Sequence, residues 1–229
     1  MRRVGCLVAV AIAIAVIFSV LGFASPETSR VVIFLPPETA MGAEFVQLIA
    51  VFDEQGVDYD VVAAEKGPYL FWEDSGEGGK ASPDLPRGYE WTIRKTFDDI
   101  DMADYDVLII GPAFAHSFWV GDSLPKAEAF LQQAYDEGMP IGGVSFGAVF
   151  LIGHGYLDGR TTARPPFYRG VVSPEAHMAG FLSTFDVIYG TECIYVDYGV
   201  GGVSTIITAN YRCVTGFAER IISEFLTED

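Results

Sequence analysis

Short apolar runs and amphipathic segments alternate along most of the chain, and this order limits the folds open to it. Residues 30–36 (RVVIFLP) form a β-branched run that ends in prolines, which is typical of a buried strand. Residues 43–55 repeat large apolar side chains at helical spacing, and Gly56 then ends the predicted helix. Further predicted strands cover 58–64, 106–110 and 140–144, and further predicted helices cover 125–138 and 146–153. Strands that alternate with helices indicate an α/β fold, with a parallel sheet covered on both faces.

The rest of the chain departs from this alternation. Residues 66–95 form an insertion rich in aromatic residues, which we predict to be a packed loop or hairpin near the sheet edge. A glycine-rich stretch at 199–202 lies between predicted strands and opens no helix, so a phosphate-binding loop is not expected there. The last predicted elements are strands at 185–188, 193–196 and 204–209 and a helix at 215–226.

The junction between the strand at 140–144 and the helix at 146–153 reads GVSFG, the G-x-S-x-G pattern of a nucleophile elbow. A residue on such a turn has a strained backbone, and its neighbours must be small because strand and helix pass close by. Gly143 and Gly147 meet this need. The following helix also directs N–H groups to the same point, which suits an oxyanion. Ser145 is therefore a candidate nucleophile, or alternatively a small residue at a tight turn.

Several segments together resemble the DJ-1/PfpI superfamily, which has the class I glutamine amidotransferase-like fold, and the resemblance covers nearly all of residues 30–227. RVVIFLP and GAEFVQLIAVFDEQGVDYDVVAAEKG are similar to the opening strand, helix and strand of that superfamily. DYDVLIIGPAFAHSFW resembles its third strand and loop, and FLQQAYDEGMPIGGVSFGAVFLIGHGYLDGRTTA its elbow region. STIITANYRCVTGFAERII resembles its last strand and helix. The resemblance implies a flavodoxin-like three-layer sandwich with a mainly parallel sheet, often as a homodimer.

The resemblance also implies roles for individual residues. Ser145 stands where the family has its elbow cysteine, and Glu44 stands where it has an acid in the first helix. The backbone N–H groups of Phe146 and Ala113 would be the oxyanion donors. The family histidine is missing, because its two known positions hold Phe146 and Ala163 in this chain. These departures leave thiol, protease and glyoxalase-type activities open to question.

A serine nucleophile needs a base, because a free hydroxyl is hardly ionised at neutral pH. Of the three histidines, His154 lies nine residues beyond Ser145 and is expected to point away from it. His116 follows the oxyanion-side loop, and His177 follows the elbow, an order that resembles the serine dipeptidases of this fold. Each histidine could also be an ordinary surface or structural residue. Glu44 could accept the serine hydrogen bond, or it could be an exposed first-turn acid. An α/β-hydrolase fits less well, since its histidine would follow a later strand.

Three classes of function follow from these residues. The first is a weak hydrolase of small amides or esters that uses Ser145 with His177, as in the dipeptidases, or with His116. The second is a small-molecule binding or sensor domain that kept the pocket and lost the chemistry. The third is a structural or partner-binding module. A polar pocket around Ser145 favours the first two, and a pocket filled by Phe114 and Phe146 favours the third. We predict neither a cofactor nor a metal site.

The N-terminus predicts export. Arg2 and Arg3 precede residues 4–24, which carry no charge and would span about 30 Å as a hydrophobic helix. This stretch is either a signal peptide cleaved before Ser25 or an uncleaved membrane anchor, and a buried helix is a third alternative. In both main cases residues 1–24 are the leader or anchor, and residues 25–229 form one DJ-1/PfpI-like domain. That domain would face outward from the cell membrane, or be secreted or periplasmic.

The net charge limits the possible partners, and the cysteine content raises the question of a disulfide. Two of the 14 basic residues precede residue 25, so residues 25–229 hold 12 basic against 31 acidic residues, a net charge of −19. Such a surface repels phosphate backbones, which makes nucleic acid an unfavourable partner. The partner expected from the pocket around Ser145 is an unknown small molecule. Cys193 and Cys213 could form a disulfide in an oxidising compartment, or could be unpaired buried thiols.

Overall fold

The structure is a computed structural model. It describes residues 30–35, 41–69, 71, 90–112, 124–163, 186–199 and 204–227. The apolar stretch at 4–24 lies outside the described residues, as do Ala113, Phe114, His116 and His177. Within the described ranges, no helix combines the length and the apolar character needed to cross a membrane.

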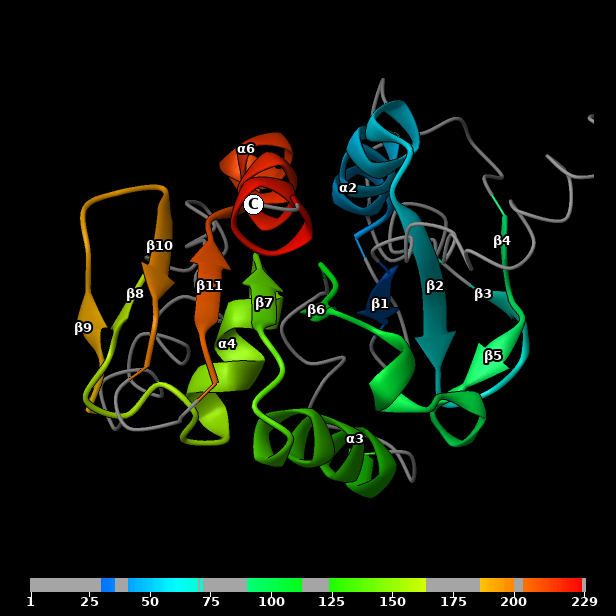
Figure 1. Ribbon diagram of the computed structural model, residues 1–229, viewed down its shortest axis with the longest axis horizontal. Helices are drawn as coiled ribbons and strands as arrows, with labels where there is room; N and C mark the ends of the chain where they lie inside the picture. Colours follow the sequence, from blue (N-terminus) through cyan, green and yellow to red (C-terminus); the bar gives the residue numbers. More distant parts are fainter. Residues whose placement is uncertain are drawn as a thin grey trace, which may run out of the picture.

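In the described part of the chain, one seven-stranded sheet has the strand order β10-β11-β7-β6-β1-β2-β5 (Figure 1). All neighbouring strands run parallel except β10 and β11, which are antiparallel. The strands are β1 (Arg30–Phe34), β2 (Asp58–Ala63), β5 (Lys95–Thr96), β6 (Val107–Ile110), β7 (Ile141–Val144), β10 (Ile194–Asp197) and β11 (Ile206–Ala209). β6, β7 and β11 are buried along their whole length, as expected where both faces of a parallel sheet are covered.

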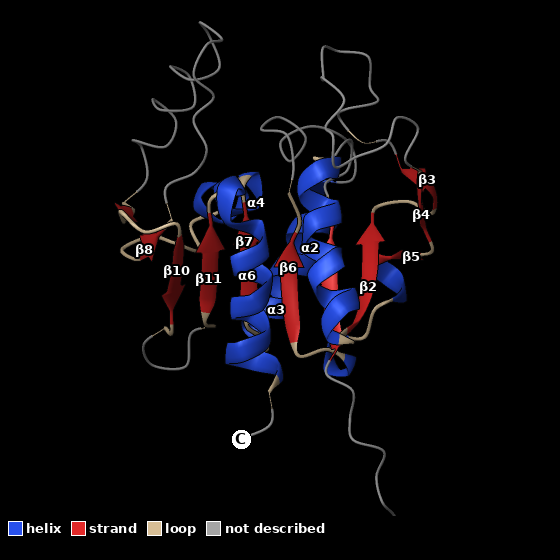
Figure 2. Ribbon diagram, turned by 90° about the horizontal axis from the view of Figure 1, so that it is seen from above, coloured by secondary structure: helices blue, strands red, loops and turns tan. Residues whose placement is uncertain are grey.

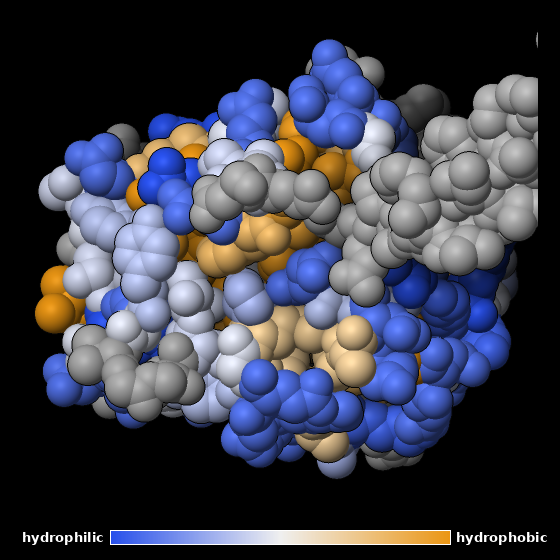
Figure 3. All heavy atoms as spheres, in the orientation of Figure 1, coloured by the Kyte–Doolittle hydropathy of each residue, from blue (hydrophilic) through white to orange (hydrophobic). Residues whose placement is uncertain are grey.

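Helices cover both faces and make the three-layer sandwich that the sequence predicts. Figure 1 shows α2 (Gly42–Gln55) and α6 (Val214–Ile221) on one side, and α3 (Leu124–Asp136) and α4 (Phe146–Gly153) on the other. Each side has its own apolar core. On the α3 and α4 side, Phe34 makes edge-to-face contacts with Phe97, Phe130 and Phe150. On the opposite side, hydrophobic residues are visible between α2 and α6 in a face that is otherwise largely hydrophilic (Figure 3).

Glycines in the left-handed region end two of the predicted helices. Gly56 has φ 69° and closes α2, and the N–H of Val57 donates to the carbonyl of Phe52 at 2.9 Å. Gly138 has φ 74° and follows α3. The predicted closing helix at 215–226 is α6 continued by a π-helical turn, η5 (Ile222–Leu226). The helix limits read from the sequence are thus confirmed.

The aromatic insertion forms a strand pair near the sheet edge, as predicted. β3 (Gly67–Tyr69) and β4 (Trp91–Ile93) pair antiparallel, and β5 then joins β2 as an additional edge strand. The insertion packs on the start of α2, because Phe45 contacts the rings of Phe71 and Trp91 at centroid distances of 5.4 and 5.1 Å. Two short 3-10 turns, η2 (Phe97–Asp99) and η3 (Met102–Asp104), lead into β6.

A second small sheet lies beside β10 (Figure 2). It pairs β8 (Thr161–Thr162) with β9 (Ile188–Tyr189) in parallel. The sequence predicts a strand at 185–188, which the structure places slightly later, and it predicts nothing at β8. The turn η4 (Tyr211–Cys213) connects β11 to α6.

An ionic cluster fastens the far edge of the main sheet. Asp60 on β2 accepts hydrogen bonds from Arg30 at 2.8 Å, from Lys95 at 2.6 Å and from the Tyr105 hydroxyl at 2.6 Å. Burial raises the pKa of Asp60, but the hydrogen bonds from Lys95 and Tyr105 and the two positive charges outweigh it. The pKa of Asp60 therefore lies below its ordinary value. The cluster ties β1, β2 and β5 together.

Candidate active site

The strand order indicates where a ligand site is expected in this sheet. The strands β2-β1-β6-β7-β11 have the 2-1-3-4-5 order of flavodoxin-like folds, so the chain reverses its direction of winding between β1 and β6. Ligands of open α/β sheets bind beyond the carboxyl ends of the strands at such a switch point. Glu44 follows β1 and Ser145 follows β7, directly beside β6. The fold therefore places both predicted residues at the expected edge of the sheet.

Ser145 has the strained backbone that the elbow pattern predicts. Its φ is 58° and its ψ is −123°. Among the described residues, it is the only non-glycine residue with a positive φ. Its N–H donates to the carbonyl of Ala209 on β11 at 2.9 Å. The side chain is fully buried, and within the described residues its Oγ makes no hydrogen bond. Strain and an unsatisfied buried hydroxyl at one residue are typical of functional sites.

The two elbow glycines are required by close backbone contacts. A Cβ at Gly147 would press into the carbonyl oxygen of Ile110 and would lie 3.1 Å from that of Gly111. A Cβ at Gly143 would lie 3.1 Å from the backbone N and Cα of Ala148. Backbone atoms cannot turn aside as a side chain can. The need for small residues on both sides of Ser145 is thus confirmed.

Glu44 is the third residue of α2 and is only 7% exposed, so the alternative of an exposed first-turn acid is wrong. The start of its helix is fixed to the strand ends, because the N–H of Met41 donates to the carbonyl of Pro112 at 3.2 Å. The neighbouring Gly111 donates to the carbonyl of Phe34 at 2.8 Å and also meets the elbow at Gly147. The starts of α2 and α4 therefore share one short segment after β6. The predicted hydrogen bond between Glu44 and Ser145 is absent, because the Oγ of Ser145 makes no hydrogen bond within the described residues.

His154 is held away from Ser145. It caps the far end of α4, where its ring lies 4.3 Å from the Phe150 ring and its Nδ1 lies 3.6 Å from a carboxylate oxygen of Glu128. Burial lowers the pKa of His154, although the charge of Glu128 acts in the opposite direction. The roles predicted for His116, His177 and Ala113 fall outside the described residues and stay predictions. Over the described ranges, no cluster of three metal-ligating side chains occurs.

A buried pair of threonines packs behind the elbow. The hydroxyl of Thr162 donates to the hydroxyl of Thr208 at 3.0 Å, and the N–H of Ala163 donates to the same Thr208 oxygen at 2.9 Å. Thr208 lies opposite Gly143 in the register of β11 and β7. Ala163, where one branch of the family has histidine, is thus buried beside β11, the neighbour of the elbow strand.

Phe146 begins α4, so the N–H groups of the first helical turn face the point where Ser145 stands. Its side chain is 4% exposed and belongs to the apolar core between the sheet and α3. The structural alternative requires Phe146 and Phe114 to fill the pocket. Phe114 lies outside the described residues, so a pocket filled by Phe114 and Phe146 stays a prediction.

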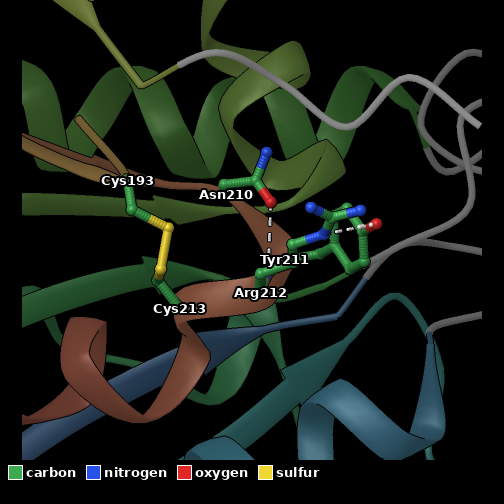
Figure 4. The surroundings of a disulfide bond; sticks show 5 residues. All are labelled: Cys193, Asn210, Tyr211, Arg212 and Cys213. Carbon is green, nitrogen blue, oxygen red and sulfur yellow. Dashed lines mark hydrogen bonds between the residues drawn. A yellow bond between two sulfur atoms is a disulfide. The ribbon is translucent and has the colours of Figure 1, made fainter. Parts of the chain in front are cut away.

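Cys193 and Cys213 form a disulfide, and their Cα atoms are 6.2 Å apart (Figure 4). Cys193 immediately precedes β10, and Cys213 ends η4 immediately before α6. The spacing lies within the roughly 7 Å that a bridge requires. Of the two alternatives that the sequence left open, the structure has the bridged one.

Comparison with known proteins agrees with this geometry. The model of the DJ-1/PfpI family matches residues 29–194, which is more than half of the chain. Solved structures with the same fold include a ThiJ/PfpI domain protein from Brachyspira murdochii, 15% identical, with a TM-score of 0.60 over 86% of this chain and 95% of that one. DJ-1beta from Drosophila melanogaster is 16% identical, with a TM-score of 0.60 over 87% and 92%. Oxidized DJ-1 from Toxoplasma gondii is 18% identical, with a TM-score of 0.57 over 84% and 89%.

Among curated proteins, none matches the sequence. The family model matches the chain without them, and its match includes the opening strand, the elbow and the segment up to the start of β10. The two solved structures share the fold over 86% and 87% of this chain. The chain belongs to the DJ-1/PfpI family.

Proposed function

We propose that this protein is a weak hydrolase of small amides or esters and that Ser145 is its nucleophile. The observation that carries the proposal is the state of Ser145, which is strained, buried and without a hydrogen bond among the described residues. Strained backbone and an unsatisfied buried hydroxyl each cost about 1–3 kcal/mol. A residue that served only as a turn would be glycine, which avoids both costs.

The proposed reaction has two steps. The Oγ of Ser145 attacks the substrate carbonyl carbon and passes its proton to a base, for which His177 and His116 are the candidates. The carbonyl oxygen becomes an oxyanion that the N–H groups of Phe146 and Ala113 would stabilise. The amine or alcohol leaves with the proton, and water then cleaves the acyl-serine ester. The roles of Ala113 and the histidines rest on the resemblance and the sequence order.

The activity should be low. The Ser145 hydroxyl makes no hydrogen bond to Glu44, and a carboxylate is in any case a weak base for an alcohol. His154 is the only histidine among the described residues, and it lies at the opposite end of α4 from Ser145. Fast acylation therefore requires that His177 or His116 reach the site.

A serine-directed fluorophosphonate probe tests the proposal on the full chain. We expect Ser145 to be labelled, and we expect Ser145→Ala to lose the label while Ser223→Ala, which alters an exposed serine, keeps it. If His177 is the base, as in the dipeptidase-like alternative, His177→Ala should slow labelling by about 10²–10⁴-fold while His116→Ala does not. The reverse result would assign His116. Labelling that does not occur at Ser145 would overturn the proposal.

A second candidate is a binding or sensor domain of the same fold that no longer catalyses. The complete burial of Ser145 favours it, because a substrate must displace neighbouring groups to reach Oγ. A small molecule would then be the partner in both cases, and the acidic net charge argues against nucleic acid. Unlabelled Ser145 in a folded protein would favour this candidate over the hydrolase.

We also propose that residues 25–229 are exported, either tethered through residues 4–24 or released after cleavage. The supports are Arg2 and Arg3, the uncharged stretch that follows, and the Cys193–Cys213 bridge, which is typical of oxidising compartments. Protease added to intact spheroplasts that express the full chain should digest the domain. Mass spectrometry of the protein not treated with protease then identifies its first residue. A protein that begins at Ser25 has lost a signal peptide, and one that retains residues 4–24 has kept its anchor. Protection of the domain from that protease would count against export.

A further inference from the structure

We propose that Cys193 and Cys213 are positioning residues for the elbow, and that their disulfide makes the Ser145 site sensitive to dithiol reductants. The inference deepens the proposed function and rests on it for its importance to activity. Its structural basis is a continuous set of contacts between the bridge and the Ser145 backbone.

The first contacts belong to the main chain. The N–H of Ser145 donates to the carbonyl of Ala209 at 2.9 Å. The next residue, Asn210, donates its own N–H to the carbonyl of Cys193 at 2.9 Å, and its carbonyl accepts from the N–H of Cys213 at 2.9 Å. Both bridged cysteines therefore bind the residue adjacent to the carbonyl that holds the elbow.

The side chain of Asn210 completes the turn. Its Oδ1 accepts from the N–H of Arg212 at 3.1 Å and so caps η4, which ends at Cys213 (Figure 4). The disulfide then joins that end to the residue before β10. The turn at 210–213 is thus held to Cys193 by one hydrogen bond and one covalent bond, and Ala209 is in addition paired with Ile194 of β10.

The elbow depends on such support because strained conformations persist only where the surroundings fix them. The hydrogen bond from Ser145 to Ala209 is a constraint that acts on the strained residue itself. Reduction by a dithiol would add two electrons and two protons to the bridge, giving two thiols and an oxidised dithiol. The turn would then keep only its hydrogen bonds, and the carbonyl of Ala209 would be held by the pairing of β11 with β7 and β10 alone.

The effect should be local. β10 is the edge strand of the sheet and pairs with β11, while β1 and β2 lie beyond β7 and β6. A bridge that served only the overall stability of the fold would, when opened, loosen all these strands together. A positioning role instead predicts a change at the elbow and the 209–213 turn, with the distant strands unaffected.

Hydrogen exchange with mass spectrometry on the full chain tests this without relying on activity. We compare the oxidised protein, the protein treated with dithiothreitol, and the Cys193→Ser/Cys213→Ser double variant. Peptides that cover the elbow and residues 209–213 should exchange on the order of tenfold faster in both altered forms, with β1 and β2 peptides unchanged. Equal acceleration in all peptides, or none at the elbow, would overturn the proposal.

The fluorophosphonate probe separates this inference from the proposed function. If Ser145 reacts, its labelling rate should fall in the reduced protein and in the double variant by a similar factor. If Ser145 reacts in none of the three forms, the proposed hydrolase fails while the exchange result still decides the positioning role. An unchanged labelling rate alongside faster elbow exchange would overturn the link between bridge and reactivity.

Discussion

Replacing Gly147 with alanine is expected to lower the free energy of unfolding by about 3 kcal/mol, because overpacking against fixed backbone is strongly destabilising. The new Cβ would press into the carbonyl oxygen of Ile110 and approach that of Gly111. Neither can move alone, because Ile110 lies in β6 and the N–H of Gly111 is bonded to Phe34. Either α4 shifts away from the sheet or the strand end does, and both movements disturb Ser145. Urea unfolding followed by fluorescence measures the loss.

Gly216→Ala is the matched control, since it also adds one methyl group near the start of a helix. There the added Cβ would meet the Cδ1 atom of Ile194 at 3.2 Å, the flexible end of a side chain. Alanine also gains about 1 kcal/mol over glycine in a helix interior, which offsets the contact. We therefore expect Gly216→Ala to have nearly the stability of the native protein. Equal stability of the two variants would contradict the close packing described for the elbow.

The sequence predicts the elements that carry strong local signals. The strand at β7 is a short apolar run, and the helix that follows is fixed by the small residues Gly143 and Gly147 around Ser145. Gly56 is identifiable as a helix end because it has no Cβ penalty in the left-handed conformation that closes α2. These features depend on residues close together in the chain, so no knowledge of distant contacts is needed.

Short edge strands are missed because their formation depends on distant partners. β5 and β8 have two residues each, too few to show any periodicity, and they are strands only through pairing with β2 and β9. The burial of Glu44 is a similar case. A first-turn acid fits an exposed helix start equally well, and the sequence does not show that the start of α2 is buried and hydrogen-bonded, through Met41, to Pro112 after β6.

The contacts behind the elbow are harder still to predict. Thr208 and Ala163 are 45 residues apart, and their hydrogen bond forms because β8 lies beside β10 and β11. The strand order likewise brings the carbonyl of Ala209 to the N–H of Ser145. The sequence therefore identifies the candidate nucleophile, whereas the groups that hold it in place emerge from the order of the strands.

Replacing Ser145 with cysteine is expected to create a thiol that peroxide oxidises on the order of tenfold faster than an ordinary surface thiol, because a helix N-terminus favours the thiolate. The thiol would stand at the N-cap of α4, in the strained conformation now held by the serine. The thiolate attacks one peroxide to give sulfenic acid, and a second peroxide gives sulfinic acid. Mass spectrometry after mild peroxide treatment should locate the sulfinic acid at residue 145.

Ser223→Cys supplies the ordinary thiol for comparison, since Ser223 is exposed on the η5 turn. Both variants keep the Cys193–Cys213 bridge, so peptide-level rates at residues 145 and 223 can be compared directly. Equal unfolding free energies would establish that neither substitution disturbs the fold. A cysteine at residue 145 that reacts no faster than the one at 223 would mean that the elbow is only a turn. Faster oxidation would mean instead that α4 and its surroundings still stabilise negative charge at this position, as a serine nucleophile requires.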